Sequence, residues 1–195
     1  GVYGGIVYSL TLDNYARAFD PLYFGIFLSS ARIAATAGAI AVLIAYPAAL
    51  AIARAPASRQ PVYLVLVMLP FWTNYLIRTY AWMVMLNPKG ILNNGFDSVG
   101  LPTLPLLYNE FAVVLGLVYN YTPFVVLTIY AALGRVSTEL LEASADLGAS
   151  ALDTFRRVLL PLTVPGIATG FVFVFVLSIG NFVTPALLGG KRVQM

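Results

Sequence analysis

The chain contains neither cysteine nor histidine among its 195 residues. Their absence excludes disulfide bonds, thiolate or imidazole metal sites, cysteine nucleophiles and Ser-His-Asp triads. Charged residues are also scarce, at 10% of the chain, whereas soluble domains carry about 25%. An integral-membrane enzyme that relies on clustered His, Cys or acidic side chains is therefore disfavoured.

Long apolar segments dominate the chain, which is 60% hydrophobic with a mean hydropathy of +0.86. A transmembrane helix needs about 20 mostly apolar residues to cross about 30 Å of hydrocarbon. Four segments are long enough, and none alternates with the period of two that a barrel strand shows. These segments are about 23–53, 62–86, 111–133 and 164–188. We therefore predict an all-α, polytopic transmembrane helix bundle that forms one domain over residues 1–195.

The polar connections indicate how the bundle is oriented. Connections 54–61 and 134–163 together carry five arginines, and an excess of basic residues is typical of cytoplasmic loops. We therefore expect both connections on the cytoplasmic side. Residues 1–22 are expected to lie outside the membrane, before the first span, and to contain a short helix around 13–19.

The connection 134–163 has the pattern of two short helices joined by a glycine turn. Ser137 or Thr138 can cap the first helix, and Gly148 provides a left-handed stop. Ser150 can cap the second helix, with Asp153 as a capping-box partner. The residues expected to break this second helix before the next span are Pro161 and Pro165.

The same connection resembles the EAA loop of permease subunits in ATP-binding-cassette (ABC) importers. Residues 142–148 read Glu-Ala-Ser-Ala-Asp-Leu-Gly, and Val-Leu-Leu-Pro follows at 158–161 after the nine intervening residues of that motif. Ser144 replaces the second alanine of the motif, and Val158 replaces an isoleucine. The resemblance implies a cytoplasmic helix that inserts into a separate ATPase. The residues that it assigns to ATPase coupling are Glu142, Ala143, Ser144, Asp146, Gly148, Ala149 and Ser150.

A nucleotide-binding P-loop requires the pattern G-x-x-x-x-G-K-[ST]. Gly190-Lys191 is followed by Arg192, and Pro185 stands where the first glycine would be. We therefore expect no ATPase site, catalytic residue, metal or cofactor in this chain. The resemblance implies that ATP and Mg²⁺ are bound by a partner ATPase.

Each predicted span contains a proline, and polar or aromatic residues flank Pro70 and Pro123. A proline frees a backbone carbonyl, which a membrane tolerates where neighbours or a wet cavity satisfy that carbonyl. These positions indicate either pore lining or packed structural kinks. The predicted substrate-pathway residues are Asn74, Tyr75, Arg78, Tyr80, Trp82, Asn120, Tyr121 and Asn181.

Arg78 is the charged residue that lies deepest in a predicted span. A charge at mid-bilayer costs about 2.5–3.5 kcal/mol, so it faces a bundle interior or a cavity, or it snorkels to the headgroups. Arg32 lies nearer the end of its span and is expected to snorkel. No Asp or Glu lies inside the four apolar segments, which disfavours a proton-coupled secondary carrier. Two small-residue motifs predict close helix packing, at Ala34/Gly38 and Gly166/Gly170.

Further stretches resemble the spermidine/putrescine permease subunits: residues 12–15, Phe-Trp-Thr-Asn at 71–74 with Ile-Arg at 77–78, and residues 180–190. The resemblance implies the fold of type I ABC importer permeases, with six spans of which this chain holds four. It also implies a bacterial cytoplasmic membrane location and alternating access. The partners it implies are a second permease, an ATPase dimer and an extracytoplasmic substrate-binding protein. Polyamines are the expected substrate, and iron(III), a phosphonate or another small solute is the alternative.

Overall fold

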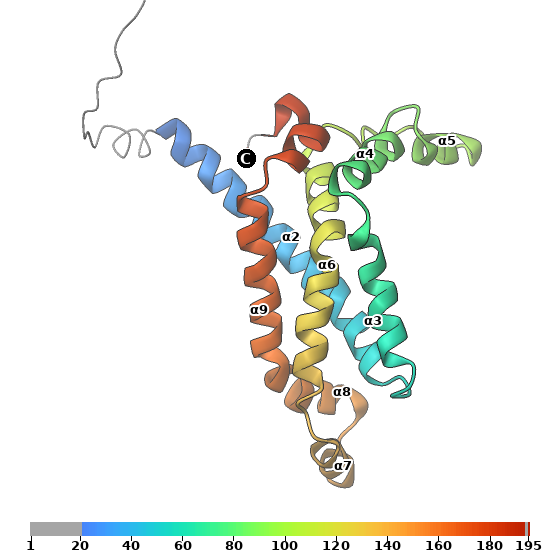
Figure 1. Ribbon diagram of the computed structural model, residues 1–195, viewed down its shortest axis with the longest axis vertical. Coiled ribbons are helices and arrows are strands. Elements are labelled where there is room, and N and C mark those ends of the chain that lie inside the picture. The colour runs from blue at the N-terminus through green and yellow to red at the C-terminus, as the bar shows by residue number, and fades with distance from the viewer. Residues whose placement is uncertain (1–20, 194) are drawn as a thin grey trace, which may run out of the picture.

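The computed structural model describes residues 21–193 and residue 195, and every regular element within them is helical. Three long helices form the core: α2 (Pro21–Ala53), α6 (Glu110–Leu133) and α9 (Leu160–Ile179). Each of the three packs against the other two (Figure 1). The predicted all-α bundle is confirmed. The expected helix around 13–19 and the stretch 12–15 lie outside the described residues.

Small residues allow the three core helices to approach closely. One face of α2 carries fully buried alanines, which are Ala34, Ala37, Ala41, Ala45 and Ala49. A Cβ added to Gly38 would lie 3.0 Å from the ring of Phe171 on α9. A Cβ added to Gly166 would lie 2.5 Å from the Cβ of Ala132 on α6. Both small-residue motifs therefore lie at helix–helix contacts, as predicted.

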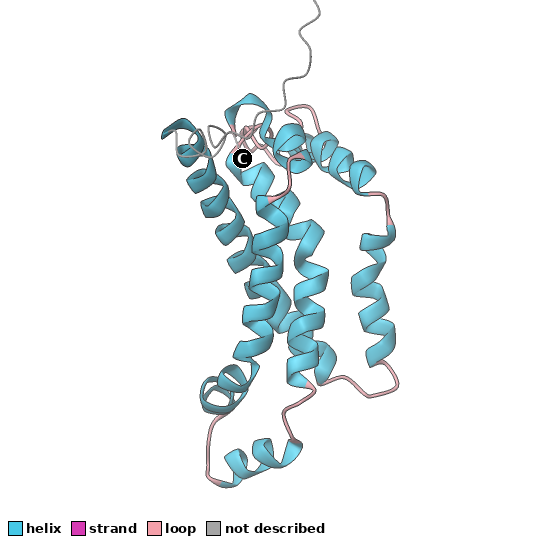
Figure 2. Cartoon of the chain, turned by 60° about the vertical axis from the view of Figure 1, so that its left-hand side comes forward, coloured by secondary structure: helices cyan, strands magenta, loops and turns pink. Residues whose placement is uncertain are grey.

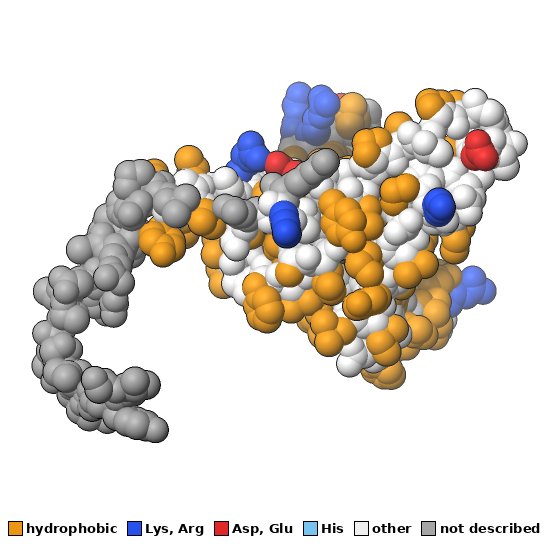
Figure 3. Space-filling model, turned by 90° about the horizontal axis from the view of Figure 1, so that it is seen from above, with side chains coloured by type: hydrophobic (Ala, Val, Ile, Leu, Met, Phe, Trp, Pro, Cys, Tyr) orange, Lys and Arg blue, Asp and Glu red, His pale blue; other side chains and the backbone are white. Residues whose placement is uncertain are grey.

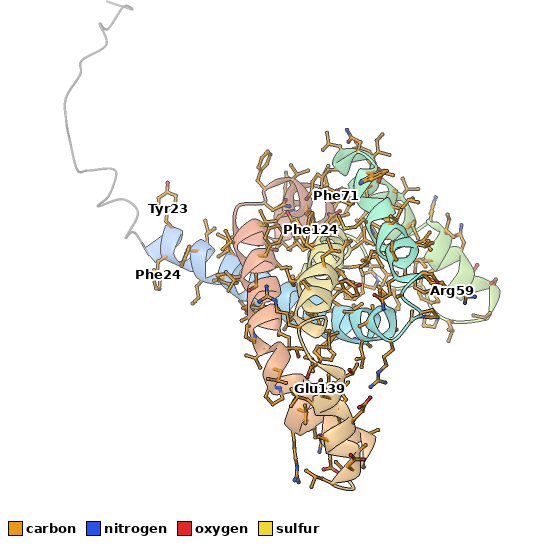
Figure 4. The ribbon with its side chains drawn as sticks, turned by 60° about the horizontal axis from the view of Figure 1, so that its bottom comes forward. Tyr23, Phe24, Arg59, Phe71, Phe124 and Glu139 are labelled. Atoms are coloured by element: carbon orange, nitrogen blue, oxygen red, sulfur yellow. The ribbon has the colours of Figure 1, made fainter. Side chains whose placement is uncertain are left out.

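The bundle presents a predominantly apolar outer surface. Viewed from the end opposite α7, hydrophobic side chains surround much of its visible edge, and the charged side chains are few and scattered (Figure 3). The first turns of α2 stand away from the other helices, with Tyr23 and Phe24 exposed (Figure 4). Among the described residues, three helices are long and apolar enough to span a membrane, and a bent pair of helices could form a fourth span.

That bent pair replaces the continuous span predicted at 62–86. Helix α3 (Gln60–Met68) passes into a 3₁₀ helix (Leu69–Trp72), and α4 (Tyr75–Leu86) then continues in a new direction. The angle between segments Gln60–Trp72 and Tyr75–Ser98 is 83°. Thr73 is extended, and the Asn74 side chain caps α4 by accepting from the Leu76 amide at 2.9 Å. The prediction missed this break because the two polar residues that form it, Thr73 and Asn74, lie within a strongly apolar segment.

The fourth span also differs from its prediction at both ends. Helix α8 (Ala151–Thr154), a π-helical segment (Phe155–Leu159) and α9 form one continuous helical segment as far as Ile179. Pro161 and Pro165 therefore do not break this helix, contrary to our expectation. The π-helical segment changes the hydrogen-bond register immediately before Pro161, where the Leu160 amide donates to the Phe155 carbonyl. Helix α9 ends before residue 188, and Pro185 begins a separate π-helical turn (Pro185–Gly189).

The other prolines have different effects. Pro47 and Pro123 lie inside α2 and α6, and both helices continue through them. The connection between α4 and α6 contains the short helix α5 (Ile91–Ser98). The buried Asn93 side chain anchors this connection, since it donates to the carbonyls of Asn87 and Leu104 at 3.2 and 3.1 Å.

The polar connections gather at two opposite ends of the molecule. The connection between α2 and α3 lies at the same end as α7 (Thr138–Asp146) and α8 (Figures 1 and 2). Helices α4 and α5 and the final turns lie at the other end. Connections 54–61 and 134–163 thus share one side of the bundle, as their arginines predicted.

Candidate functional site

Helix α7 and the turn after it form a projection at one end of the bundle (Figure 1). Ser137 occupies the N-cap position, as expected, although its side chain makes no capping hydrogen bond. Leu147 ends the helix, and Gly148 follows with φ of +75°. This left-handed conformation strongly favours glycine. The predicted helix–glycine–helix arrangement is therefore confirmed.

Side-chain hydrogen bonds fix the turn between α7 and α8. The Ser150 hydroxyl accepts from the Asp153 amide at 3.2 Å and donates to the Asp153 carboxylate. The bond from Ser150 also lowers the pKa of Asp153 below its usual value. Across the turn, the hydroxyls of Ser144 and Thr154 lie 2.8 Å apart. The turn is thus held in one shape by its own side chains.

Most residues that were assigned to ATPase coupling are exposed on this projection. Glu142, Ala143, Asp146, Gly148 and Ser150 are exposed, whereas Ser144 and Ala149 are half-buried within the turn.

Sequence reasoning did not single out Leu147, which is 89% exposed at the tip of the projection. Leu140 on α7 and Leu152 on α8 are also exposed. Exposed leucines on a short polar projection suit the binding of another protein. The available signal was the motif itself, since Leu147 lies directly before the motif glycine.

A pocket of about 420 Å³ lies at the base of the projection, between the ends of α2 and α6 and the start of α7. The Tyr130 hydroxyl donates to the Gln60 side-chain oxygen at 2.6 Å. The Gln60 amide donates in turn to the carbonyls of Ala53 and Ala55, at 3.2 and 2.9 Å. These bonds tie α6 to the connection between α2 and α3. The base of the projection is therefore joined to three helices of the bundle.

A second cluster of polar side chains joins α4, α6 and the segment after α9. The Asn181 amide nitrogen donates to the hydroxyl of Tyr121 at 2.8 Å and also to the hydroxyl of Tyr75. The Thr184 hydroxyl binds the Tyr75 hydroxyl, and the Thr184 amide donates to the Asn181 side-chain oxygen at 3.0 Å. The cluster brings together three of the predicted pathway residues, Tyr75, Tyr121 and Asn181. Thr184 is a member that sequence reasoning missed, and its position inside the segment 180–190 was the only signal.

Arg78 lies beside this cluster and is buried, with 6% of its surface exposed. Its guanidinium donates to the Pro70 carbonyl at 3.0 Å, across the break between α3 and α4. Arg78 therefore faces the interior of the chain. Arg32 forms an exposed ion pair with Glu110 at 2.6 Å instead of standing alone at the membrane surface.

The remaining predicted pathway residues are dispersed. Asn74 caps α4, Tyr80 is exposed, and the Trp82 ring packs edge-on against Tyr119 with centroids 5.4 Å apart. Asn120 is 1% exposed, and neither polar atom of its side chain has a hydrogen-bond partner within the described residues. The Ser178 hydroxyl is likewise buried without a partner there. Buried polar groups are normally satisfied, so Asn120 and Ser178 are exceptions among the described residues. Asn120 was a predicted pathway residue, whereas Ser178 was not.

Comparisons of the chain with known proteins show which family it belongs to. The chain matches the family model described as "Binding-protein-dependent transport system inner membrane component" over residues 41–194. It is 42% identical over 190 residues to the "Spermidine/putrescine transport system permease protein PotB" of Haemophilus influenzae, covering 96% of this chain and 66% of that protein. It is 41% identical over 184 residues to the Escherichia coli protein of the same name, covering 93% and 67%. The chain thus spans about two thirds of the length of the curated relatives it matches.

Solved structures support the fold. A bacterial ABC transporter involved in the import of the acidic polysaccharide alginate superposes with a TM-score of 0.70 at 19% identity, covering 96% of this chain and 70% of that chain. At this identity the likeness shows the fold alone, which is the permease fold that the sequence predicted. The family description also confirms the predicted inner-membrane location. The chain belongs to the family of binding-protein-dependent transport system inner membrane components.

Proposed function

We propose that this chain is part of the pore subunit of an ATP-driven importer that takes up polyamines such as spermidine and putrescine. The observation that carries the proposal is the identity of 41–42% to spermidine/putrescine permeases over nearly the whole chain. The Escherichia coli "Inner membrane ABC transporter permease protein YdcU", whose name gives no substrate, is 36% identical over 194 residues.

Within this proposal, the projection around α7 docks on the cytoplasmic ATPase. Its support is the combination of an ordered glycine turn, the exposed Leu147 and the motif residues that surround them. ATP and Mg²⁺ are bound by that ATPase rather than by this chain. When two ATPase subunits close on ATP, they draw two such projections together, and the bundle changes from inward-facing to outward-facing.

The cluster of Tyr75, Tyr121, Asn181 and Thr184 is the proposed constriction of the substrate pathway. It connects α4, α6 and the segment after α9, so relative movement of these elements must break its hydrogen bonds. A second permease completes the pathway, and an extracytoplasmic binding protein delivers the substrate. A small, hydrogen-bonded cluster suits a pathway whose selectivity is provided largely by the binding protein.

The test is the ATPase activity of the full-length complex in lipid, with its binding protein, against spermidine, putrescine, iron(III), a phosphonate and a sugar. Stimulation by the two polyamines alone is the expected result. Stimulation by another member of the panel would replace the polyamine assignment and keep the role of the projection.

A further inference from the structure

Arg78 is a buried cation without a counter-ion in the described part of the chain. The ion pairs found there are Arg32–Glu110 and Arg157–Asp153, and neither involves Arg78. Its guanidinium makes one hydrogen bond, to the Pro70 carbonyl, and its Nε has no partner. Buried charges are ordinarily paired because water no longer stabilises them. Some other feature must therefore hold this charge.

Aromatic rings take the place of the missing counter-ion. The Arg78 Cζ lies 5.7 Å from the ring centroid of Phe71, 5.8 Å from that of Tyr75 and 6.0 Å from that of Tyr119. We call these three rings the aromatic box. The negative face of an aromatic ring attracts a cation within about 6 Å, and such boxes also recognise the ammonium groups of ligands.

The aromatic box opens toward the outside of the chain. Phe71 and Tyr119 are 39% and 37% exposed, whereas Arg78 is 6% exposed. The guanidinium thus fills the inner part of a box whose walls remain accessible. Tyr75 belongs both to this box, through its ring, and to the hydrogen-bonded cluster, through its hydroxyl.

We infer that the aromatic box is a binding site for an ammonium group of the substrate, and that Arg78 occupies it as a tethered surrogate cation when substrate is absent. The two cations exclude one another, because the Arg78 guanidinium already lies within about 6 Å of all three rings. Departure of Arg78 breaks its bond to Pro70 at the break between α3 and α4 and frees the ring of Tyr75. Cation exchange is thereby coupled to the break and to the hydrogen-bonded cluster. The identification of the bound cation as a polyamine rests on the proposed function. The existence of a cation-binding box rests only on the distances between Arg78 and the three rings.

Trp82 provides a reporter for this site, because its ring lies edge-on to Tyr119 at 5.4 Å. The experiment uses the complete transporter in lipid nanodiscs without its binding protein, in a Trp72→Phe background because Trp72 is 80% exposed. Guanidinium chloride and spermidine are titrated separately, and the signal is the fluorescence change that disappears in a Trp82→Phe control. Arg78→Gln empties the box, and Arg78→Lys retains a positive charge. Arg78→Met, which keeps the aliphatic stem, is used if Arg78→Gln does not assemble.

We expect Arg78→Gln to show a saturable fluorescence response to guanidinium. The concentration that gives half of this response should be about tenfold or more lower than for the parent and for Arg78→Lys. A tenfold difference corresponds to about 1.4 kcal/mol of binding free energy, which is the expected cost of displacing a cation that already occupies the box. Tyr119→Leu in the Arg78→Gln background should abolish the response. Equal responses of parent, Lys and Gln variants would overturn the inference, and so would a response that survives Tyr119→Leu.

The two probes separate this inference from the proposed function. A response of Arg78→Gln to guanidinium without one to spermidine supports a cation box and contradicts the polyamine assignment. Polyamine-stimulated ATPase activity in the parent complex, together with no response of assembled Arg78→Gln to either probe, overturns the box and leaves the proposed function in place.

Discussion

Single residues set the shape of both functional regions. At the projection, Gly148 adopts φ of +75° and has no heavy atom within 4 Å of an added Cβ. At the cluster, Asn181 uses both amide hydrogens and its oxygen to hold Tyr75, Tyr121 and Thr184. The first residue acts through its backbone and the second through its side chain, so different substitutions test them.

Gly148→Val should uncouple ATP hydrolysis from transport while the complex still assembles. A β-branched residue in the left-handed region costs about 1–2 kcal/mol, which the turn can relieve by changing its shape. Gly148→Asn is the matched control, because asparagine tolerates this conformation and the site has space for it. The measurement is substrate-stimulated ATPase activity. Equal stimulation of the Val and Asn variants would show that the conformation of the turn is unimportant.

Asn181→Ala should lower the free energy of unfolding of the complex by about 1–3 kcal/mol, because it leaves the Thr184 amide and the Tyr121 hydroxyl without their partner. The Tyr75 hydroxyl loses one of its two bonds and keeps the one to Thr184. Thermal unfolding of the purified complex measures this effect. The neighbouring Phe182→Ala provides the control, since Phe182 is 76% exposed. An equal change in the two variants would argue against a structural role for the cluster.

At the scale of elements, close packing of α2, α6 and α9 forms the rigid part of the molecule. A Cβ at Gly166 would lie 2.5 Å from the Cβ of Ala132 and 2.8 Å from the Thr128 carbonyl oxygen. Both atoms belong to α6, and neither a backbone oxygen nor an alanine Cβ can move aside unless the helix itself moves. The helices that differ most from prediction, α3 and α4, pack outside this core.

Gly166→Val should destabilise the bundle by about 1–3 kcal/mol through overpacking between α6 and α9. Gly25→Val is the same change in another helix at a position where an added Cβ meets nothing within 4 Å, so it should be nearly neutral. The recovery of folded protein after heating in detergent compares the two variants. A Gly25 variant as unstable as the Gly166 variant would contradict the packing explanation.

The sequence predicted those features that depend on local periodicity and on short motifs. The spans of α2 and α6, the glycine turn at Gly148 and the cap at Ser150 all follow from residues that are close in the chain. The break at Thr73 and Asn74 was missed because it is made by two polar residues within an otherwise apolar segment. Three members of the cluster, Tyr75, Tyr121 and Asn181, were predicted as pathway residues. Their contact and the participation of Thr184 were not, because segments distant in sequence meet only when the bundle forms.

At the scale of the whole molecule, the projection and the hydrogen-bonded cluster are joined by continuous helices. Helix α6 carries Tyr121 in the cluster and Tyr130 near the base of the projection. The helical segment 151–179 leads from the turn after Gly148 to the residues directly before Asn181. A displacement of the projection can therefore reach the cluster through two stiff helices.

Leu147→Asp should weaken the binding of the permease to its ATPase about tenfold to a hundredfold, because it removes about 1.5–3 kcal/mol of apolar burial at the tip of the projection. Val99→Asp, at the opposite end of the molecule and 70% exposed, should leave binding unchanged. Titration of the ATPase onto the detergent-solubilised permease complex measures both. Unaltered affinity of the Leu147 variant would move the docking surface away from this projection.

The most direct measurement of the central claim is ATP-driven uptake of labelled spermidine into proteoliposomes that contain the complete transporter and its binding protein. We expect uptake that requires ATP, that unlabelled putrescine reduces, and that Gly148→Val abolishes while ATP hydrolysis continues. ATP-driven uptake of iron(III), a phosphonate or a sugar by the same vesicles, without uptake of spermidine, would contradict it.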